Sequence, residues 1–280
     1  MKVAFATHPA QADKPNEDLT ILGPDLAILL DGAGGPSEDG GGCTHGVHWY
    51  VPELGANLLT RLLTAQQPLA TVLAEAIGAV AQLHAPTCDL TDPGTPSSTV
   101  AIVRRRADQF EYLSLHDSTI VFTMTDDVRV VSDRRVQQIP ELQPLWEDMS
   151  RCLLGTEDHA IARRAYMAVE RRHRNTAGGY WVAGSDPRSA AEAVTGNIPA
   201  ARVHSVSLLS DGVAEYVDAY RLATWPQVVE TLERKGPASV IELVRAAENR
   251  DPLGRQWPRF KVHDDASAVH WTLAHQNRTR

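Results

Sequence analysis

The chain has few cysteines and no long apolar run. Its three cysteines, Cys43, Cys88 and Cys152, are odd in number and widely spaced. That pattern predicts a reducing compartment and neither a disulfide framework nor a zinc site. Near the N-terminus, Pro9 and Asp13 interrupt the sequence before an apolar stretch long enough for a signal peptide or a membrane span can form. We therefore expect a cytoplasmic protein that does not contact a membrane.

Positive charge is also scarce. Lys and Arg total 27 against 35 Asp and Glu, which gives a formal charge of -8. A nucleic-acid surface normally needs clustered Lys and Arg, so we expect no nucleic-acid partner. The basic runs at residues 104–106 and 171–172 are either solvated ends of a strand or helix or contacts for an anionic substrate or partner. No Pro/Gly/Ser-rich linker divides the chain, which predicts one domain over residues 1–280.

The apolar patterning predicts grouped strands and helices. Runs rich in β-branched residues predict strands at 2–6, 26–30, 99–103, 110–115, 119–123, 203–209 and 266–271. Apolar residues at three- and four-residue spacing predict helices at 52–63, 68–84, 157–173 and 226–249, the last broken at Gly236-Pro237. Grouped elements differ from steady β-α-β alternation, so we expect an α+β fold with antiparallel sheet and helices packed outside it.

Three of the apolar runs have an Asp at one end. Asp31 and Asp211 each follow a run and precede a glycine, and Asp264 precedes the last run. One Asp-Gly pair alone is an ordinary turn signal. Carboxylates at the ends of several buried strands are costly and repel one another unless a cation binds between them. Oxygen ligands suit magnesium or manganese better than zinc.

Six short segments follow one another along nearly the whole chain. They are Asn16-Glu17-Asp18, Asp31-Gly32-Ala33-Gly34-Gly35, Ser97-Ser98-Thr99-Val100, His116-Asp117-Ser118, Leu209-Ser210-Asp211-Gly212-Val213 and Asp264-Asp265-Ala266-Ser267. In this order they resemble the motifs of the PPM, or PP2C, family of metal-dependent serine/threonine phosphatases, bacterial members included. The resemblance implies a four-layer αββα sandwich, in which two antiparallel β-sheets pack face to face with helices outside.

The resemblance also implies catalytic and metal-binding roles. It implies that two Mn²⁺ or Mg²⁺ ions have direct carboxylate ligands, namely Asp31, Asp211 and Asp264. Asp31 would bridge the ions, the Gly32 carbonyl would be a further ligand, and Asp18 would act mainly through metal-bound water. Asp117 matches the residue that helps to hold a third, weaker metal. Two such ions can lower the pKa of a shared water and supply hydroxide to attack a phosphoryl group.

The sequence departs from the family pattern near the expected substrate. Lys14 stands where members usually have a phosphate-binding Arg, and it is either a replacement cation or a solvated loop lysine. His116 replaces the usual Gly before Asp117, and it is either a general acid or a structural histidine. Residues 171–181 fall where the family has a mobile flap. This segment either recognises substrate, with Arg174 meeting a phosphate, or is a helix end leading to a buried aromatic strand.

The resemblance predicts hydrolysis of a phosphomonoester, with phosphoserine or phosphothreonine in a protein as the expected substrate. A small phosphorylated metabolite is the enzymatic alternative, because the phosphate-binding Arg is missing. The third possibility is a catalytically inactive pseudophosphatase that binds a protein partner, although Asp31, Asp211 and Asp264 are all present.

Overall fold

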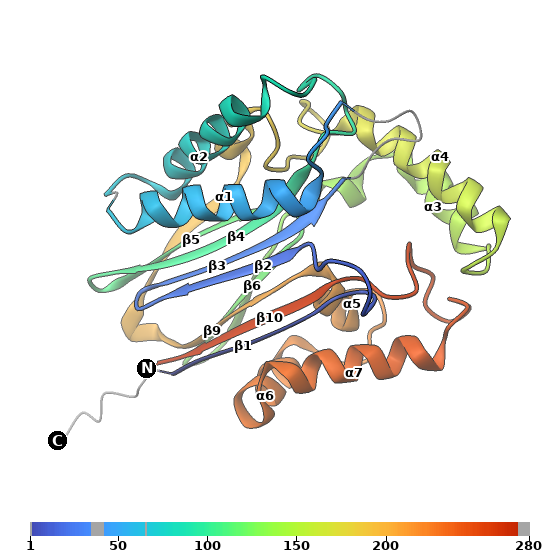
Figure 1. Ribbon diagram of the computed structural model, residues 1–280. Helices are drawn as coiled ribbons and strands as arrows, with labels where there is room; N and C mark the ends of the chain where they lie inside the picture. The colour runs from blue at the N-terminus through green and yellow to red at the C-terminus, as the bar shows by residue number, and fades with distance from the viewer. Residues whose placement is uncertain (1, 35–41, 65, 274–280) are drawn as a thin grey trace.

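The computed structural model describes residues 2–34, 42–64 and 66–273, and contains two five-stranded β-sheets (Figure 1). One sheet has the order β2-β3-β4-β5-β8, formed by Asp18–Gly23, Leu26–Ala33, Ser97–Arg106, Gln109–Leu115 and Val194–Pro199. The other has the order β1-β10-β9-β6-β7, formed by Lys2–His8, Ala266–Thr272, Val203–Leu209, Thr119–Met124 and Val128–Val131. Each pairing between these strands is antiparallel.

Helices lie outside both sheets. Helices α1 (Val47–Leu62) and α2 (Leu69–His84) cover the β2–β8 sheet, whereas α5 (Asp211–Asp218), α6 (Trp225–Lys235) and α7 (Pro237–Arg250) cover the other (Figure 1). Helices α3 (Leu142–Ser150) and α4 (Glu157–His173) project to one side of the sandwich. Short 3₁₀ helices span Arg135–Gln138, Pro187–Glu192 and Ala200–Arg202. This arrangement confirms the expected αββα sandwich. None of the helices in the described parts of the chain combines the length and apolar character that a membrane span needs.

Alternation along β3 sets the direction of the side chains at its end. Ile28 and Leu30 pack in the layer beneath α1 and α2, whereas Ala27 and Leu29 pack between the two sheets. Successive residues of a strand point to opposite faces. Asp31 therefore follows the face that lies between the sheets, and the next residue follows the face toward α1.

The structure adds elements that the sequence patterns did not predict, namely β2, β7, β8, α3 and α5. Strand β8 contains Gly196 and ends at Pro199, and both residue types are depleted in strands, but an edge position tolerates them. The Asp211-Gly212 pair was interpreted as a turn, and it instead begins α5. Helix α1 starts at Val47, earlier than the predicted start at Pro52. Gly35, the last residue of the glycine-rich motif, lies outside the described residues.

Gly32 is where α1 approaches the end of β3. A Cβ atom there would collide with the side chain of Val47 and lie 2.7 Å from the carbonyl oxygen of Glu17. We expect Gly32→Ala to lower the free energy of unfolding by about 1–3 kcal/mol, because neither the helix nor the Glu17 backbone can withdraw cheaply. Gly78→Ala is the matched control, since its Cβ would meet only Pro187 at 3.5 Å. Urea denaturation should show no loss for that variant, and equal stability of both variants would contradict the close packing.

Candidate metal centre

Strand register brings the first two carboxylates together. Asp18 of β2 lies directly opposite Asp31 of β3, and Asp31 in turn lies opposite Thr99 of β4. Directly opposed residues of antiparallel strands share one face of the sheet. Asp18 and Asp31 therefore both point into the space between the two sheets.

The second sheet supplies two more carboxylates at the same end. Asp211 is the first residue of α5, directly after β9, and Asp264 lies just before β10, the neighbour of β9. The charges of Asp211, Asp18, Asp264 and Asp117 all act on Asp31. The structure thus brings together the acidic residues that the sequence places far apart.

The pKa values of Asp18, Asp31 and Asp211 show that negative charges lie close together here. Burial raises the pKa of Asp31 and of Asp211 well above the ordinary value, and neighbouring carboxylates raise both further. Burial also raises the pKa of Asp18 to about 7. Both carboxylate oxygens of Asp18 are buried and make no hydrogen bond of normal geometry among the described residues, although the hydroxyls of Ser267 and Ser210 lie near enough to lower its pKa in part. Unpaired carboxylate oxygens in such a position are the ligands that a hard divalent cation requires, so these residues fit a magnesium or manganese centre.

Asp265 braces the cluster and is not a free ligand. Its two carboxylate oxygens accept hydrogen bonds from the backbone amides of Ala10 and Glu17, at 2.7 and 2.8 Å. The backbone amide of Asp18 donates to the side chain of Asn16 at 2.9 Å. These bonds fix the loop that leads into β2, and so hold Asp18 opposite Asp31.

Gly212 lets α5 approach the end of β10. A Cβ atom at this position would collide with the carbonyl oxygen of Asp265 and lie 3.4 Å from the Cβ of Asp264. Ser210 and Ser267 exchange two hydrogen bonds nearby, of 3.0 and 2.9 Å. The glycine of the Asp-Gly pair therefore serves close packing, and it brings Asp211 beside Asp264.

Lys261 is a cation at this centre that the sequence analysis missed. Its Nζ atom lies 2.7 Å from Oδ1 of Asp264. Although burial lowers the pKa of Lys261, the charges of Asp264, Asp211 and Asp31 raise it on balance. Lys14 has an exposed side chain in the loop between β1 and β2, and its binding of phosphate stays a prediction. The three-residue spacing from Asp264 was the only signal for Lys261 in the sequence.

His116 forms an ion pair with Asp117. The two side chains approach to 2.7 Å between Nδ1 and Oδ1. Burial lowers the pKa of His116, but the charge of Asp117 outweighs this effect and raises it overall. His116 has a φ of 69°, a left-handed conformation that explains why the family has glycine at the matching position. Because the Asp117 carboxylate already contacts His116, a third metal would compete with this side chain for it.

Residues 171–181 form a helix end and a turn. Helix α4 ends at His173, and Tyr180 is buried with its ring centroid 5.0 Å from that of His116. The guanidinium of Arg174 donates hydrogen bonds to the carbonyl oxygens of Pro93, Thr95 and Pro96. These bonds hold the approach to β4, as the structural interpretation of this segment predicts. Binding of substrate by Arg174 stays a prediction.

The spacing of the cysteines predicts no zinc site, but the fold brings two of them beside two histidines. One group of side chains in the described part of the chain brings its sulfur and nitrogen ligand atoms within 4.8 Å of one another; it consists of Cys43, His45, His84 and Cys88. Counting cysteines alone overlooked the two histidines, which chain folding brings to the thiols. The clustered carboxylates do not form so close a group. This is expected because like charges repel one another and because their oxygens would be divided between two ions.

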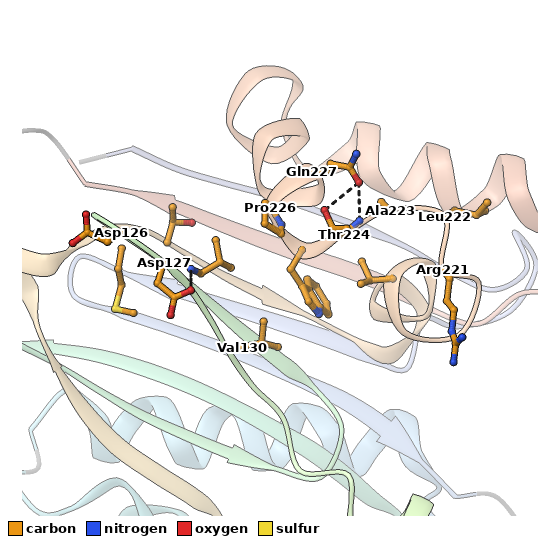
Figure 2. Close-up of a pocket in the computed structure, with 14 residues that line it drawn as sticks. Asp126, Asp127, Val130, Arg221, Leu222, Ala223, Thr224, Pro226 and Gln227 are labelled. Atoms are coloured by element: carbon orange, nitrogen blue, oxygen red, sulfur yellow. Dashed lines mark hydrogen bonds between the residues drawn. The ribbon is translucent and has the colours of Figure 1, made fainter.

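A separate cleft of about 920 Å³ lies between the β6–β7 turn and the loop before α6 (Figure 2). Asp126 and Asp127 line one side, and Arg221 and Thr224 line the other. Its lining includes none of the four clustered carboxylates at residues 18, 31, 211 and 264. We therefore place the candidate site at the clustered carboxylates and not at this cleft.

The raised pKa values predict how pH affects the metal-free protein. Between the ordinary carboxyl pKa of 3.8 and the value of about 7 for Asp18, the folded state holds protons that the unfolded chain releases. Stability should then fall as pH rises through this window, and Mn²⁺ should raise the melting temperature more at about pH 8 than at about pH 5. Differential scanning fluorimetry with chelator or Mn²⁺ measures this. Asp211→Asn, which removes one charge of the cluster, should flatten the dependence; an unchanged slope would contradict the electrostatic account.

Solved structures share this fold. The serine/threonine phosphatase PstP/Ppp of Mycobacterium tuberculosis has 14% identity and a TM-score of 0.58, covering 98% of this chain and 99% of that chain. Stp1 of Staphylococcus aureus has 13% identity and a TM-score of 0.58, covering 98% and 95%. The catalytic domain of PstP in complex with two manganese ions has 13% identity and a TM-score of 0.56, covering 98% of each chain.

The sequence itself gives no comparable match: no protein-family model matches it, and no curated protein matches it. The structural similarity nevertheless extends over nearly the whole described chain and over nearly all of each solved structure. The chain therefore has the fold of the bacterial PPM serine/threonine phosphatases.

Proposed function

We propose that residues 1–280 form a single metal-dependent phosphatase domain of the PPM type, which hydrolyses phosphomonoesters. The observation that carries the proposal is the pair of buried, unpartnered carboxylate oxygens of Asp18, opposite Asp31 and within the field of Asp264. A protein gains nothing in stability from gathering such charges. A cation site at which a phosphoryl group can bind accounts for them.

Each carboxylate has its own proposed role in metal binding. Asp31, Asp211 and Asp264 would be the direct carboxylate ligands, and the Gly32 carbonyl would be a further ligand. Asp18 would contribute mainly through water. When bound, two Mn²⁺ or Mg²⁺ ions supply a water of lowered pKa as the nucleophile and neutralise the phosphoryl oxygens. Asp117 would help to hold a third, weaker metal, and that ion would have to compete with His116 for the carboxylate.

Two residues supply positive charge toward the substrate. Lys261, which pairs with Asp264, is the proposed contact for a phosphoryl oxygen, in the role expected of Lys14. Asp117 raises the pKa of His116, which favours its protonated form, and His116 is the candidate general acid for the leaving group. Phosphoserine or phosphothreonine in a protein is the proposed substrate, and a small phosphorylated metabolite is the alternative within the same chemistry.

One contact favours the binding-only alternative. The ammonium of Lys261 neutralises part of the acidic cluster through Asp264 without any metal. In a pseudophosphatase such an ion pair could replace the cations outright. Metal-dependent turnover distinguishes the two, because only the phosphatase needs an ion at the carboxylates.

The proposed reaction can be tested with p-nitrophenyl phosphate. Protein stripped with chelator should be inactive, and Mn²⁺ or Mg²⁺ should restore turnover. Asp31→Asn and Asp211→Asn should each lower kcat/KM by at least about 100-fold, because each removes a charged ligand at nearly constant volume. Asp126→Asn, an exposed residue of the separate cleft, is the control and should keep full activity.

Three results would argue against this assignment. Full turnover of Asp31→Asn or Asp211→Asn would remove the carboxylates from the mechanism. Equal activity with and without chelator would remove the metals. Folded protein that binds Mn²⁺ but hydrolyses neither p-nitrophenyl phosphate nor phosphopeptides would favour the pseudophosphatase.

Comparing two lysines tests which one contacts the phosphate. At saturating Mn²⁺, we expect Lys261→Gln to raise KM by about tenfold, because a charged hydrogen bond to the phosphoryl group is lost. Lys14→Gln should leave KM unchanged, since its side chain is exposed in a loop. Steady-state kinetics on one phosphopeptide measures both. A rise in KM for Lys14→Gln alone would return the role to Lys14.

A further inference from the structure

Four side chains with soft ligand atoms meet at the start of α1. Cys43 and His45 lie in the loop that leads into this helix, and His84 and Cys88 come from the end of α2 and the turn after it. Cys43 Sγ lies 2.8 Å from His84 Nε2, and Cys88 Sγ lies 3.4 Å from His45 Nδ1. All four ligand atoms lie within 4.8 Å of one another.

These distances suit a tetrahedral ion. With Zn–S bonds of about 2.3 Å and Zn–N bonds of about 2.0–2.1 Å, tetrahedral ligand atoms stand roughly 3.3–3.8 Å apart. The observed pairs fall around this range, so binding needs only small side-chain movements. Two thiols and two imidazoles select zinc over magnesium or manganese, because the latter prefer oxygen ligands.

The backbone around the group favours thiolates. The amides of His45 and Gly46 donate to Cys43 Sγ at 3.2 and 3.3 Å, and the amide of Thr44 donates to Cys88 Sγ at 3.3 Å. N–H donors directed at sulfur stabilise the negative charge that a metal-bound cysteine carries. The loop therefore directs backbone amides at both sulfur atoms.

Aromatic contacts orient the two imidazoles. The ring of Trp49 stacks on His45 with centroids 4.4 Å apart and lies 5.1 Å from that of His84. His84 is almost fully buried. The tryptophan thus shields one side of the group from water and limits the rotation of both histidines, as the surroundings of a metal ligand should.

We propose that Cys43, His45, His84 and Cys88 bind one Zn²⁺ as a structural site. Four protein ligands leave no open position for substrate, so the ion supports the fold and takes no part in catalysis. It ties the loop that follows the glycine-rich motif to the end of α2, where the Asp89 amide also donates to the Gly42 carbonyl at 2.6 Å. The site is distinct from the carboxylate centre in both position and ligand chemistry, and it does not depend on the phosphatase activity.

Metal analysis of the full chain tests the site. Protein purified without chelator and dialysed should retain about one zinc per chain by inductively coupled plasma mass spectrometry. Cys88→Ser and His84→Gln should each lose most of it. Cys152→Ser is the matched control, because this third cysteine lies away from the group, after α3. Asp211→Asn should keep its zinc, which separates this site from the carboxylate centre.

Cobalt substitution identifies the ligands in wild-type protein, so the test stands even if a variant fails to fold. Co²⁺ added to zinc-free protein should produce thiolate-to-cobalt charge-transfer absorption and the intense visible bands of tetrahedral cobalt. Cobalt spectra without thiolate bands would overturn the proposal. So would zinc content in Cys88→Ser equal to that of wild type, or zinc-free native protein in which thiol titration finds Cys43 and Cys88 joined as a disulfide.

Discussion

Repulsion between carboxylates at one end of the β-sandwich is the constraint on which the site depends. The register of β2 and β3 sets Asp18 opposite Asp31, and the end of β9 and the start of β10 add Asp211 and Asp264. The raised pKa values of Asp18, Asp31 and Asp211 express the free energy that this arrangement costs when no cation is bound. A divalent ion converts the same arrangement from a source of instability into a binding site.

The residues around the cluster make that crowding possible. Gly32 and Gly212 allow α1 and α5 to approach where a Cβ atom would collide. Asp265 uses its carboxylate to hold the loop before Asp18, and Arg245 donates to the backbone carbonyl of Asp264. The rigid surroundings keep the ligands in place before a metal arrives, which lowers the cost of ordering them on binding.

Asp31, Asp211 and Asp264 were predictable as site residues because each stands beside an apolar run. Their meeting, and the addition of Asp18 and Asp117, was implied only by the family resemblance. The positive charges were not predictable in the same way. Lys261 lies in an irregular segment whose path no local pattern encodes, and Lys14 stands in place of the Arg that the family motif has there. The expected sandwich was confirmed, whereas β8 was missed because tertiary pairing at a sheet edge overrides the low strand propensity of its Gly and Pro.

The cysteine–histidine group shows the limit of sequence spacing most clearly. His45 and His84 are 39 positions apart in the numbering, and only the packing of α1 against α2 brings their loops together. The two proposed sites would give the chain two kinds of metal environment. Oxygen ligands lie on the β3 side, and sulfur and nitrogen ligands lie on the α1 side. The oxygen site prefers hard ions and the sulfur–nitrogen site prefers softer ones, so the two sites do not compete for the same ion.

Anomalous diffraction from a crystal grown with Mn²⁺ is the most direct test of the central claim. Data collected on the two sides of the manganese absorption edge locate that metal without reference to activity. We predict manganese peaks between Asp31 and Asp211, with Asp264 in the same coordination group and Asp18 in reach through water. A well-ordered crystal with no manganese peak at these carboxylates would contradict the account, because the charges gathered there would then be balanced by the protein alone.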